Sequence, residues 1–251
     1  MKSLSKALDT IDAVAEAGSV GIRELATITG LPPSTTHRIV ATLVRKHYFQ
    51  QDPVTKRYSL SFRFLELGSK VQQQTHLTSI AHPHLERLMA ETRESINLAV
   101  RDRDSAVYLD IVQSKYSMLQ LFTRPGARVP LYATGVGKLF LSQMSVSDLD
   151  AYLQRVALTP FTRYTLIERN KIIDNLKQIR TKGFAVDNEE MEEGVRCVAA
   201  CVFDYNGQPA ASVSITGAAM RVTPDRVEHF GELIKSCALD ISRELGFNSA
   251  N

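Results

Sequence analysis

The sequence predicts an α+β protein in which an N-terminal winged helix-turn-helix precedes an α/β domain built on an antiparallel sheet. Residues 22–46 carry two apolar stripes at helical spacing, separated at Gly30. Beyond residue 77, short apolar runs alternate with longer helical patterns, which is typical of a sheet flanked by helices. The 251 residues suffice for one small and one medium-sized domain, each with its own core.

The net positive charge of the chain comes from its N-terminal part. Residues 1–75 hold ten Lys or Arg and six Asp or Glu, whereas residues 76–251 hold twenty and twenty-one. The formal net charge of +3 therefore comes entirely from the first part of the chain. A local basic excess favours contact with a polyanion.

Three helices open the chain. Apolar side chains recur at helical spacing over residues 5–17, and Gly18 is suited to end that helix. The second helix, from residue 22, ends at Gly30, a residue that adopts the left-handed conformation without strain. The third begins at a Pro-Pro-Ser segment and carries an apolar face that includes Ile39 and Leu43.

The opposite face of the third helix has the side chains of a DNA reader. We expect that face to be exposed, and we expect Ser34 or Thr35 to cap the helix and meet a phosphate. Thr36, His37 and Arg38 are the expected base readers, with Arg38 suited to guanine. Residues 25–51 contain no Asp or Glu, as a surface for a polyanion requires. The alternative is an ordinary polar helix face.

A short hairpin is expected after the third helix. Residues 48–50 and 57–60 read as extended pieces joined by a turn over residues 52–55. This is the wing, and we expect its cations, together with one at the end of the third helix, to contact the phosphate backbone. These cations are Lys46, Lys56 and Arg57.

The rest of the chain reads as a linker helix and a mixed domain. We divide it into a winged helix-turn-helix over residues 1–61, a linker helix over 62–77 and a C-terminal domain over 78–251, with the boundary near 73–77. Expected helices span residues 78–92, 135–144, 147–153, 166–182 and 224–245. Expected strands span residues 96–101, 106–112, 118–122, 184–186, 196–203 and 209–216, with hairpin turns at 102–105 and 204–207.

Composition points to a cytoplasmic protein without cofactor or metal. The N-terminus does not read as a signal peptide, and no apolar run reaches the roughly 18 residues of a membrane span. The three cysteines suit a reducing compartment. Cys197 and Cys201 are too far apart along a strand to share a zinc ion. His82 and His84 are expected at the surface.

Several motifs occur in a distinctive order. They are SLSKALDTIDAVAEAG, IRELATITGLPPSTTHRIVATLVRKHYF and RYSLSFRFLELG, then PLYATGVGKLFLS and GFAVDNEEMEEGVRCVAACVFDYNGQPAASVSITG. On these motifs the chain resembles the IclR family of bacterial transcriptional regulators over nearly its whole length. The resemblance implies a dimer that binds a palindromic operator in double-stranded DNA. It also implies a GAF-like C-terminal domain that binds a small effector and is often tetrameric.

The resemblance also implies where an organic acid effector binds. The positions that match the family's effector contacts are Gly135, Val136, Asp187, Cys197, Ser214 and Thr216. The residues themselves suit this role, because a helix start and two hydroxyls on one side of a strand can receive a carboxylate. The alternative is that the glycines serve turns and packing and that the hydroxyls pair with backbone.

Two positions depart from the common family pattern. Val136 is larger than the alanine often found there, and Thr216 adds a methyl group to the serine of some members, so both could alter the size of the pocket. The segment over residues 110–138 looks closest to the branch that responds to 2-keto-3-deoxygluconate, a sugar acid.

These observations favour a transcriptional regulator whose binding to an operator is controlled by a small carboxylate or sugar acid. We expect it to be a repressor, since repression is the more frequent outcome in the family that it resembles. Two alternatives remain at this point. One is an enzyme with Cys197 as nucleophile fused to a DNA-binding module, which would need a nearby base. The other is a DNA-bound scaffold that takes no effector.

Overall fold

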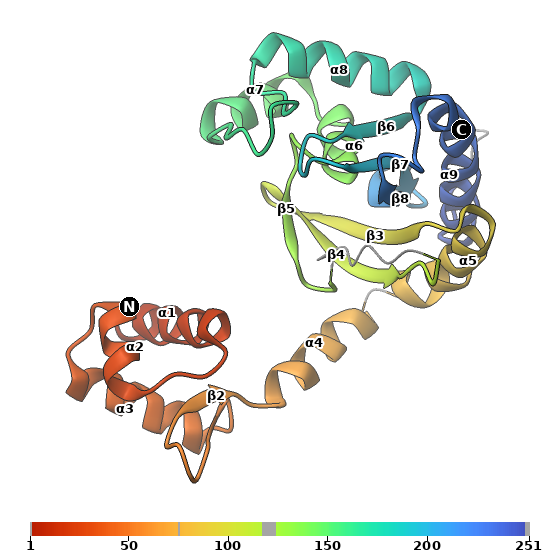
Figure 1. Cartoon of the computed structure of the whole chain (residues 1–251). Helices are drawn as coiled ribbons and strands as arrows, with labels where there is room; N and C mark the ends of the chain where they lie inside the picture. The colour runs from red at the N-terminus through yellow and green to blue at the C-terminus, as the bar shows by residue number, and fades with distance from the viewer. Residues whose placement is uncertain (1, 75, 117–123, 249–251) are drawn as a thin grey trace. The chain divides into compact units, whose positions relative to one another are not determined.

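A computed structural model describes residues 2–74, 76–116 and 124–248 of the chain. The chain divides into two units, one up to residue 75 and one from residue 76 onward (Figure 1). The sequence interpretation placed the domain edge near residues 73–77 and treated residues 62–77 as a separate linker helix. The strand expected over residues 118–122 lies outside the described residues. No helix in the described part of the chain is long and apolar enough to cross a membrane.

The N-terminal unit is the winged helix-turn-helix that the sequence predicts. Its elements are α1 (Lys2–Ala17), α2 (Ile22–Thr29), α3 (Pro33–Arg45), β1 (Phe49–Gln51), β2 (Tyr58–Leu60) and α4 (Arg63–Gln74). Gly30 ends α2 in the left-handed conformation at φ 65°. β1 and β2 pair antiparallel as the wing, and Val20 forms a further bridge with Tyr58. The apolar faces of α1, α2 and α3 meet the wing in one core, which includes Val14, Leu25 and Val40.

The C-terminal unit is a six-stranded antiparallel sheet flanked by helices. Its helices are α5 (Leu77–Thr92), α6 (Gly135–Ser142), α7 (Val146–Arg155), α8 (Arg169–Lys182) and α9 (Pro224–Glu244). Its strands are β3 (Ser95–Asp102), β4 (Ser105–Val112), β5 (Arg128–Pro130), β6 (Phe184–Asn188), β7 (Val195–Phe203) and β8 (Pro209–Ala218). They lie in the order β5-β4-β3-β8-β7-β6, and each neighbouring pair is antiparallel. β3 and β8, which are far apart in the sequence, therefore pair with each other at the centre of the sheet.

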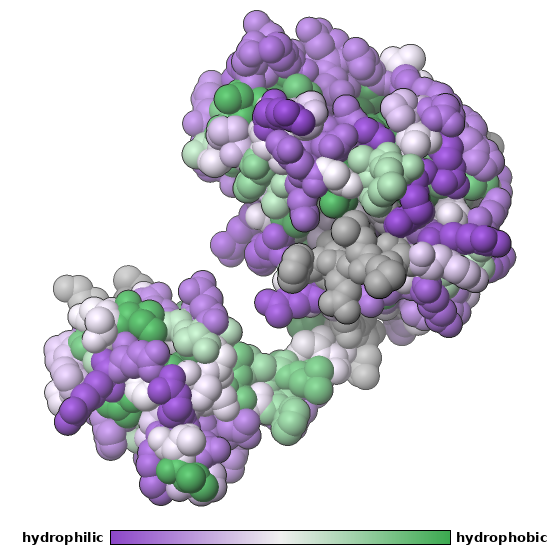
Figure 2. Space-filling view, viewed as in Figure 1, coloured by the Kyte–Doolittle hydropathy of each residue, from purple (hydrophilic) through white to green (hydrophobic). Residues whose placement is uncertain are grey.

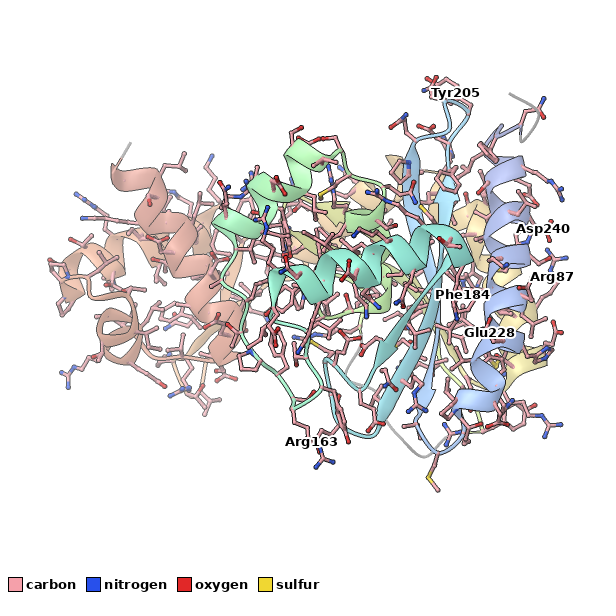
Figure 3. All side chains as sticks on the ribbon, turned by 90° about the horizontal axis from the view of Figure 1, so that it is seen from above. Arg87, Arg163, Phe184, Tyr205, Glu228 and Asp240 are labelled. Atoms are coloured by element: carbon pink, nitrogen blue, oxygen red, sulfur yellow. The ribbon has the colours of Figure 1, made fainter. Side chains whose placement is uncertain are left out.

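The sheet separates two hydrophobic cores. Alternate residues of β7 point to opposite faces, so Val198 and Ala200 join the core under α5 and α9, whereas Ala199 and Cys201 join the core under α6 and α8. α8 and α9 pack on opposite faces of the sheet, and Figure 3 shows Phe184 where the C-terminal end of α8 approaches α9. The polar residues of the candidate site lie on the α6 side of this sheet.

Three expectations from the sequence differ from the structure. The helix expected from residue 166 begins at Arg169, and β5 was not expected. The turn expected over residues 102–105 is confined to Arg103 and Asp104, because the strands pair up to Asp102 and Ser105.

His84 is buried rather than at the surface, with 8% of its side chain exposed. Its Nε2 lies 2.7 Å from a Glu244 carboxylate oxygen on α9, and Arg87 Nη2 lies 2.8 Å from its Nδ1. The expectation failed because His84 faces α9, a partner 160 residues away in the chain. His82, in contrast, is 46% exposed.

Candidate functional site

The exposed face of α3 carries most of the predicted DNA-contacting side chains. Ser34, His37 and Arg38 are exposed, and Thr35 is half-buried. Arg45 is also exposed, one helical repeat of seven residues beyond Arg38, and the sequence interpretation missed it. The i, i+7 spacing of the two arginines was the available signal. Together they place two guanidinium groups on one side of the helix.

Thr36 does not belong to this face, and its prediction as a base reader is wrong. Its side chain is fully buried together with Val40 and Leu43, which follow it at intervals of four and seven residues. Its Oγ1 donates a hydrogen bond of 3.2 Å to the Pro32 carbonyl oxygen. Helical phase therefore turns Thr36 toward the core, and its hydroxyl is used within the helix.

The predicted cap of α3 is also different. Pro32 occupies the N-cap position and Pro33 follows as the first helical residue, and no side chain caps the helix. Neither Ser34 nor Thr35 can cap it, since both lie inside the first turn. The helix begins at Pro33, before both expected caps, because proline suits the first helical position.

The wing cations occupy different environments. Lys56 is exposed in the turn, at φ 57°, and Lys46 is exposed directly after α3. Arg57 instead donates from Nη2 to the Ser19 carbonyl oxygen at 2.6 Å and to Glu24 at 2.9 Å. Arg57 thus ties the wing to α2, and part of its charge is compensated within the unit.

All six predicted effector residues line one cavity of about 220 Å³ in the C-terminal unit. They come from four different elements, α6, β6, β7 and β8. The full lining among the described residues is Tyr108, Ala127, Arg128, Val129, Thr134, Gly135, Val136, Asp187, Met191, Glu192, Val195, Cys197, Ser214 and Thr216. The tertiary structure thus brings together the six predicted residues, which lie up to 81 positions apart in the sequence, from Gly135 to Thr216.

Strand register sets three of these side chains in a row. Asp187 on β6 pairs with Cys197 on β7, which pairs in turn with Thr216 on β8. Directly opposite residues of antiparallel strands have their Cβ atoms about 4.5–5.5 Å apart on one face. Ser214 precedes Thr216 by two residues and faces the same side. The row therefore presents a carboxyl, a thiol and two hydroxyls to α6.

The N-terminus of α6 crosses directly over this row. A Cβ atom on Gly135 would lie 3.3 Å from Ala199 Cβ and 3.7 Å from Cys197 Cβ, so the small residues allow the close approach. Thr134 caps the helix, and its Oγ1 accepts a bond of 3.2 Å from Gly137 N. The first N–H groups of a helix have no partner within it and favour an anion. Gly137 serves packing instead, since a Cβ there would lie 2.3 Å from Leu131 Cα.

Asn97 on β3 donates hydrogen bonds to the two hydroxyls, and the sequence interpretation missed this residue. Its Nδ2 donates to Ser214 Oγ at 3.1 Å and to Thr216 Oγ1 at 2.9 Å. A hydroxyl that accepts in this way keeps its own proton for donation. Asn97 is fully buried between Ile96 and Leu98 in the sequence. An amide inside an apolar strand was the available signal.

Asp187 is a buried carboxyl in a cluster of charges. Its side chain is 3% exposed, and its Oδ1 accepts from Glu190 N at 2.8 Å. Burial raises the pKa of Asp187 to about 7, and the nearby Lys138 cation partly opposes that shift. Lys138 is itself buried and donates to the Glu190 carboxylate and, at 2.6 Å, to the Val186 carbonyl oxygen. Asp187 and Glu190, two members of the acidic segment over residues 187–193, are therefore buried in the site rather than solvated.

The surroundings of Cys197 are those of a residue that lines a cavity, not those of a reactive cysteine. Burial raises the pKa of its thiol, and the neighbouring Asp187 carboxyl adds to the shift. A thiol that stays protonated is the opposite of an activated nucleophile. In residues 2–74, 76–116 and 124–248, no group of three His, Cys, Asp or Glu side chains is placed to hold a metal ion.

Known proteins resemble both units. The IclR helix-turn-helix domain matches residues 3–53, and the bacterial transcriptional regulator IclR C-terminal domain matches residues 69–243. The acetate operon repressor of Salmonella typhimurium is 35% identical over 248 residues, which cover 98% of this chain and 90% of that protein. The KdgR regulator of Escherichia coli is 31% identical over 248 residues, covering 99% and 94%.

A solved structure agrees with these matches. The crystal structure of IclR from Thermotoga maritima is 34% identical, has a TM-score of 0.81 and covers 98% of this chain and 100% of that chain. The two domain matches span most of the sequence, in the same order as the winged helix-turn-helix and the sheet domain. The chain belongs to the IclR family of bacterial transcriptional regulators.

Proposed function

We propose that the protein is an effector-controlled transcriptional repressor that binds a palindromic operator as a homodimer in the cytoplasm. The exposed face of α3 reads the major groove, with His37 and Arg38 as base readers and Arg45 beside them. Lys46 and Lys56 contact phosphates and supply affinity without sequence choice. Repression is supported by the name of the Salmonella relative, the acetate operon repressor.

An apolar surface on the N-terminal unit supports association of two copies. Phe62, Leu65 and Val71 are exposed on or beside α4, and Leu4 and Leu8 are exposed on α1. Figure 2 shows apolar side chains gathered over α4. Exposed apolar patches of this kind mark protein–protein contacts. A second copy covering these residues would present two α3 helices to the two halves of an operator.

The effector site is the cavity below the α6 N-terminus. The single observation that carries it is the convergence of Gly135, Val136, Asp187, Cys197, Ser214 and Thr216 on one cavity. In the proposed complex the N–H groups at the helix start and the two hydroxyls hold the carboxylate of a small organic acid. Ser214 and Thr216 both accept from Asn97 and lie 3.4 Å from each other, so even when one hydroxyl donates to the other, at least one proton is left for that carboxylate.

DNA reading is tested by three variants compared on operator and random DNA. An operator is first selected from random duplexes. Arg38→Ala is expected to lower operator affinity by about 1–3 kcal/mol and relax sequence preference, while Lys56→Ala weakens both DNAs alike and reduces the salt slope by about one. Thr36→Val, whose side chain faces the core, is the matched control and leaves operator preference unchanged. Equal losses on both DNAs for Arg38→Ala contradict its role as a reader.

Effector control is tested by pairing two substitutions in the cavity. Ser214→Ala combined with Thr216→Val removes both donors while conserving volume, so it abolishes the response of operator binding to added organic acids. DNA affinity without acid stays at the wild-type value, which controls for folding. An unchanged acid response in this double variant would place the effector elsewhere.

A further inference from the structure

Two acidic side chains lie among the DNA-contacting elements of the N-terminal unit. From residue 17 to residue 65 the sequence contains no other Asp or Glu than Glu24 on α2 and Asp52 in the wing turn. An acid near a polyanion opposes binding. Asp52 shapes the turn, since its Oδ1 accepts from Val54 N at 2.8 Å and from Thr55 N at 2.7 Å. Glu24 is also used inside the unit, and its contacts involve the wing.

Glu24 joins the start of α2 to the wing through one carboxylate oxygen. Its Oε2 accepts from Arg57 Nη2 at 2.9 Å and from Gly21 N at 3.4 Å. The same Arg57 nitrogen also donates to the Ser19 carbonyl oxygen at 2.6 Å. Glu24, Arg57 and the segment over residues 19–21 therefore form one connected contact, which we call the wing brace.

The wing brace lies where the buried base of the wing passes into its exposed tip. Tyr58 is buried in the core of the unit and exchanges two backbone hydrogen bonds with Val20, at 2.8 and 2.9 Å. Residues 51–56 are exposed. Arg57 connects these two parts, and Lys56, the proposed phosphate contact, directly precedes it. The wing brace therefore restricts where the Lys56 cation lies relative to α2.

We propose that Glu24 and Arg57 are positioning residues for DNA binding, and that the wing brace holds the wing tip where Lys56 meets a phosphate. This inference rests on the proposed contact of the wing with DNA. It gives Arg57 a role inside the unit in place of the phosphate contact expected from the sequence. It also gives Glu24 an unusual sign, because removal of this acid should weaken binding to a polyanion. The physical reason is that a segment already ordered in the free protein loses less entropy on binding.

The test measures the affinity of Glu24→Ala, Arg57→Ala and the double variant for an operator selected from random duplexes. Glu24→Ala is expected to weaken operator binding about three- to tenfold, because the wing tip must then be ordered on binding. Arg57→Ala weakens it by a similar factor, and the double variant is no weaker than either single variant, since all three lose the same contact. Glu16→Ala, at an exposed position of α1, is the matched control: it removes the same charge from a helix outside the wing brace and does not weaken binding.

A second measurement separates positioning from charge and from folding. Lys56→Ala should cost less affinity in the Glu24→Ala background than in the wild-type chain, because an unbraced Lys56 has already lost most of its contact. Independent effects would instead multiply. The melting temperature of Glu24→Ala, followed by circular dichroism, should stay close to the wild-type value, since the side chains of Arg57 and Glu24 are 41% and 50% exposed and such ion pairs add little stability.

Three results would overturn the inference and leave the proposed function standing. Tighter operator binding by Glu24→Ala would show that repulsion dominates and that Arg57 is a phosphate contact; Arg57→Ala would then lower the salt slope by about one. An equal cost of Lys56→Ala in both backgrounds would remove the positioning role. No effect of Lys56→Ala in the wild-type chain would remove the wing from the DNA contact. If the wild-type chain selects no operator at all, the proposed function fails, and this inference fails with it.

Discussion

At the scale of single residues, the charge inside the proposed effector cavity is set by ionisable groups that are buried away from water. Asp187 faces Lys138 from α6, Glu190 from the following turn, Cys197 from β7 and Tyr108 from β4. The thiol and the phenol stay neutral because burial raises the pKa of both. Asp187 is therefore the group in this set whose charge changes near neutral pH, at a pKa of about 7.

Effector affinity is expected to fall as pH rises through 7. Below the pKa of Asp187 its carboxyl is neutral and does not oppose a carboxylate ligand; above it, two anions share one cavity. The dissociation constant of an organic acid effector should rise by up to about tenfold per pH unit above 7. Titration calorimetry between pH 5.5 and 8.5 measures this. Asp187→Asn keeps an oxygen for Glu190 N and should flatten the curve; the same slope in that variant assigns the titration to another group.

The same ionisation affects the stability of the ligand-free fold. Because the folded pKa of Asp187 lies above its usual 3.8, the folded state holds the proton more tightly than the unfolded chain. This contribution is present in full below about pH 4 and is lost as pH rises through 7. Asp187→Asn should therefore raise the melting temperature more at pH 8 than at pH 4.

The buried pair of Lys138 and Glu190 is expected to be sensitive to the loss of one partner. Their side chains are 1% and 6% exposed. Lys138→Met leaves the Glu190 charge buried alone and should lower the free energy of unfolding by about 3–5 kcal/mol. Lys138→Met combined with Glu190→Leu should recover most of that loss. Urea unfolding measures both variants, and a double variant as unstable as the single one would show that the charges themselves are not the cause.

At the scale of elements, α6 is the part of the fold that makes the site. Its eight residues are all buried, and its first turn lies over β7 where Ala199 offers only a methyl group. Gly137 lets the helix lie against the backbone of Leu131, in the segment that leads from β5 into α6. A fixed distance between helix and sheet is what places N–H donors above the row of Asp187, Cys197 and Thr216.

Gly137→Ala is expected to displace α6 and damage the cavity. The added Cβ would lie 2.3 Å from Leu131 Cα and 2.5 Å from its carbonyl oxygen, so backbone must move. We expect a loss of about 1–3 kcal/mol in the free energy of unfolding, with weaker effector binding. Gly68→Ala in α4 is the control, since nothing lies within 4 Å of its Cβ and alanine favours a helix by about 0.5–1 kcal/mol. Equal stability of the two variants would contradict the packing role of Gly137.

At the scale of the whole molecule, the chain consists of two units with separate cores, to which we assign different roles, DNA binding and effector binding. The N-terminal core contains Val14 and Leu25, and the two cores of the C-terminal unit contain no residue before Leu77. We propose that an effector alters DNA binding through α4 and α5, the helices that follow one another at the boundary, by changing the placement of two DNA-binding units on a two-half operator. Such coupling needs both units and the helices α4 and α5 at their boundary, whereas effector binding needs only the C-terminal unit.

A chain limited to residues 76–251 is therefore expected to fold and to bind the effector as the full chain does. Its affinity for an organic acid should lie within about twofold of the full-length value, because every lining residue of the cavity lies in this unit. Circular dichroism and calorimetric titration measure folding and affinity. A folded fragment that binds acids much more weakly would show that the N-terminal unit contributes to the site.

The sequence by itself determined the elements and the family. Helical and strand periodicity are local, so residues 22–46 predicted the helix-turn-helix, and Ser214 and Thr216 were predicted on one side of a strand. The motifs located the six cavity residues through resemblance. The burial of Thr36 follows from the helical phase that it shares with Val40 and Leu43, a local pattern that the sequence interpretation overlooked. Local pattern could not supply the partner on α9 that buries His84.

Only the tertiary structure decided how the cavity works. Asn97, Tyr108 and Lys138 enter the site through pairing of β3 with β8, of β4 with β3, and packing of α6 on β6. These are contacts between residues far apart in the chain, so no spacing in the sequence records them. The pKa of Asp187 follows from burial, which is a property of the packed fold.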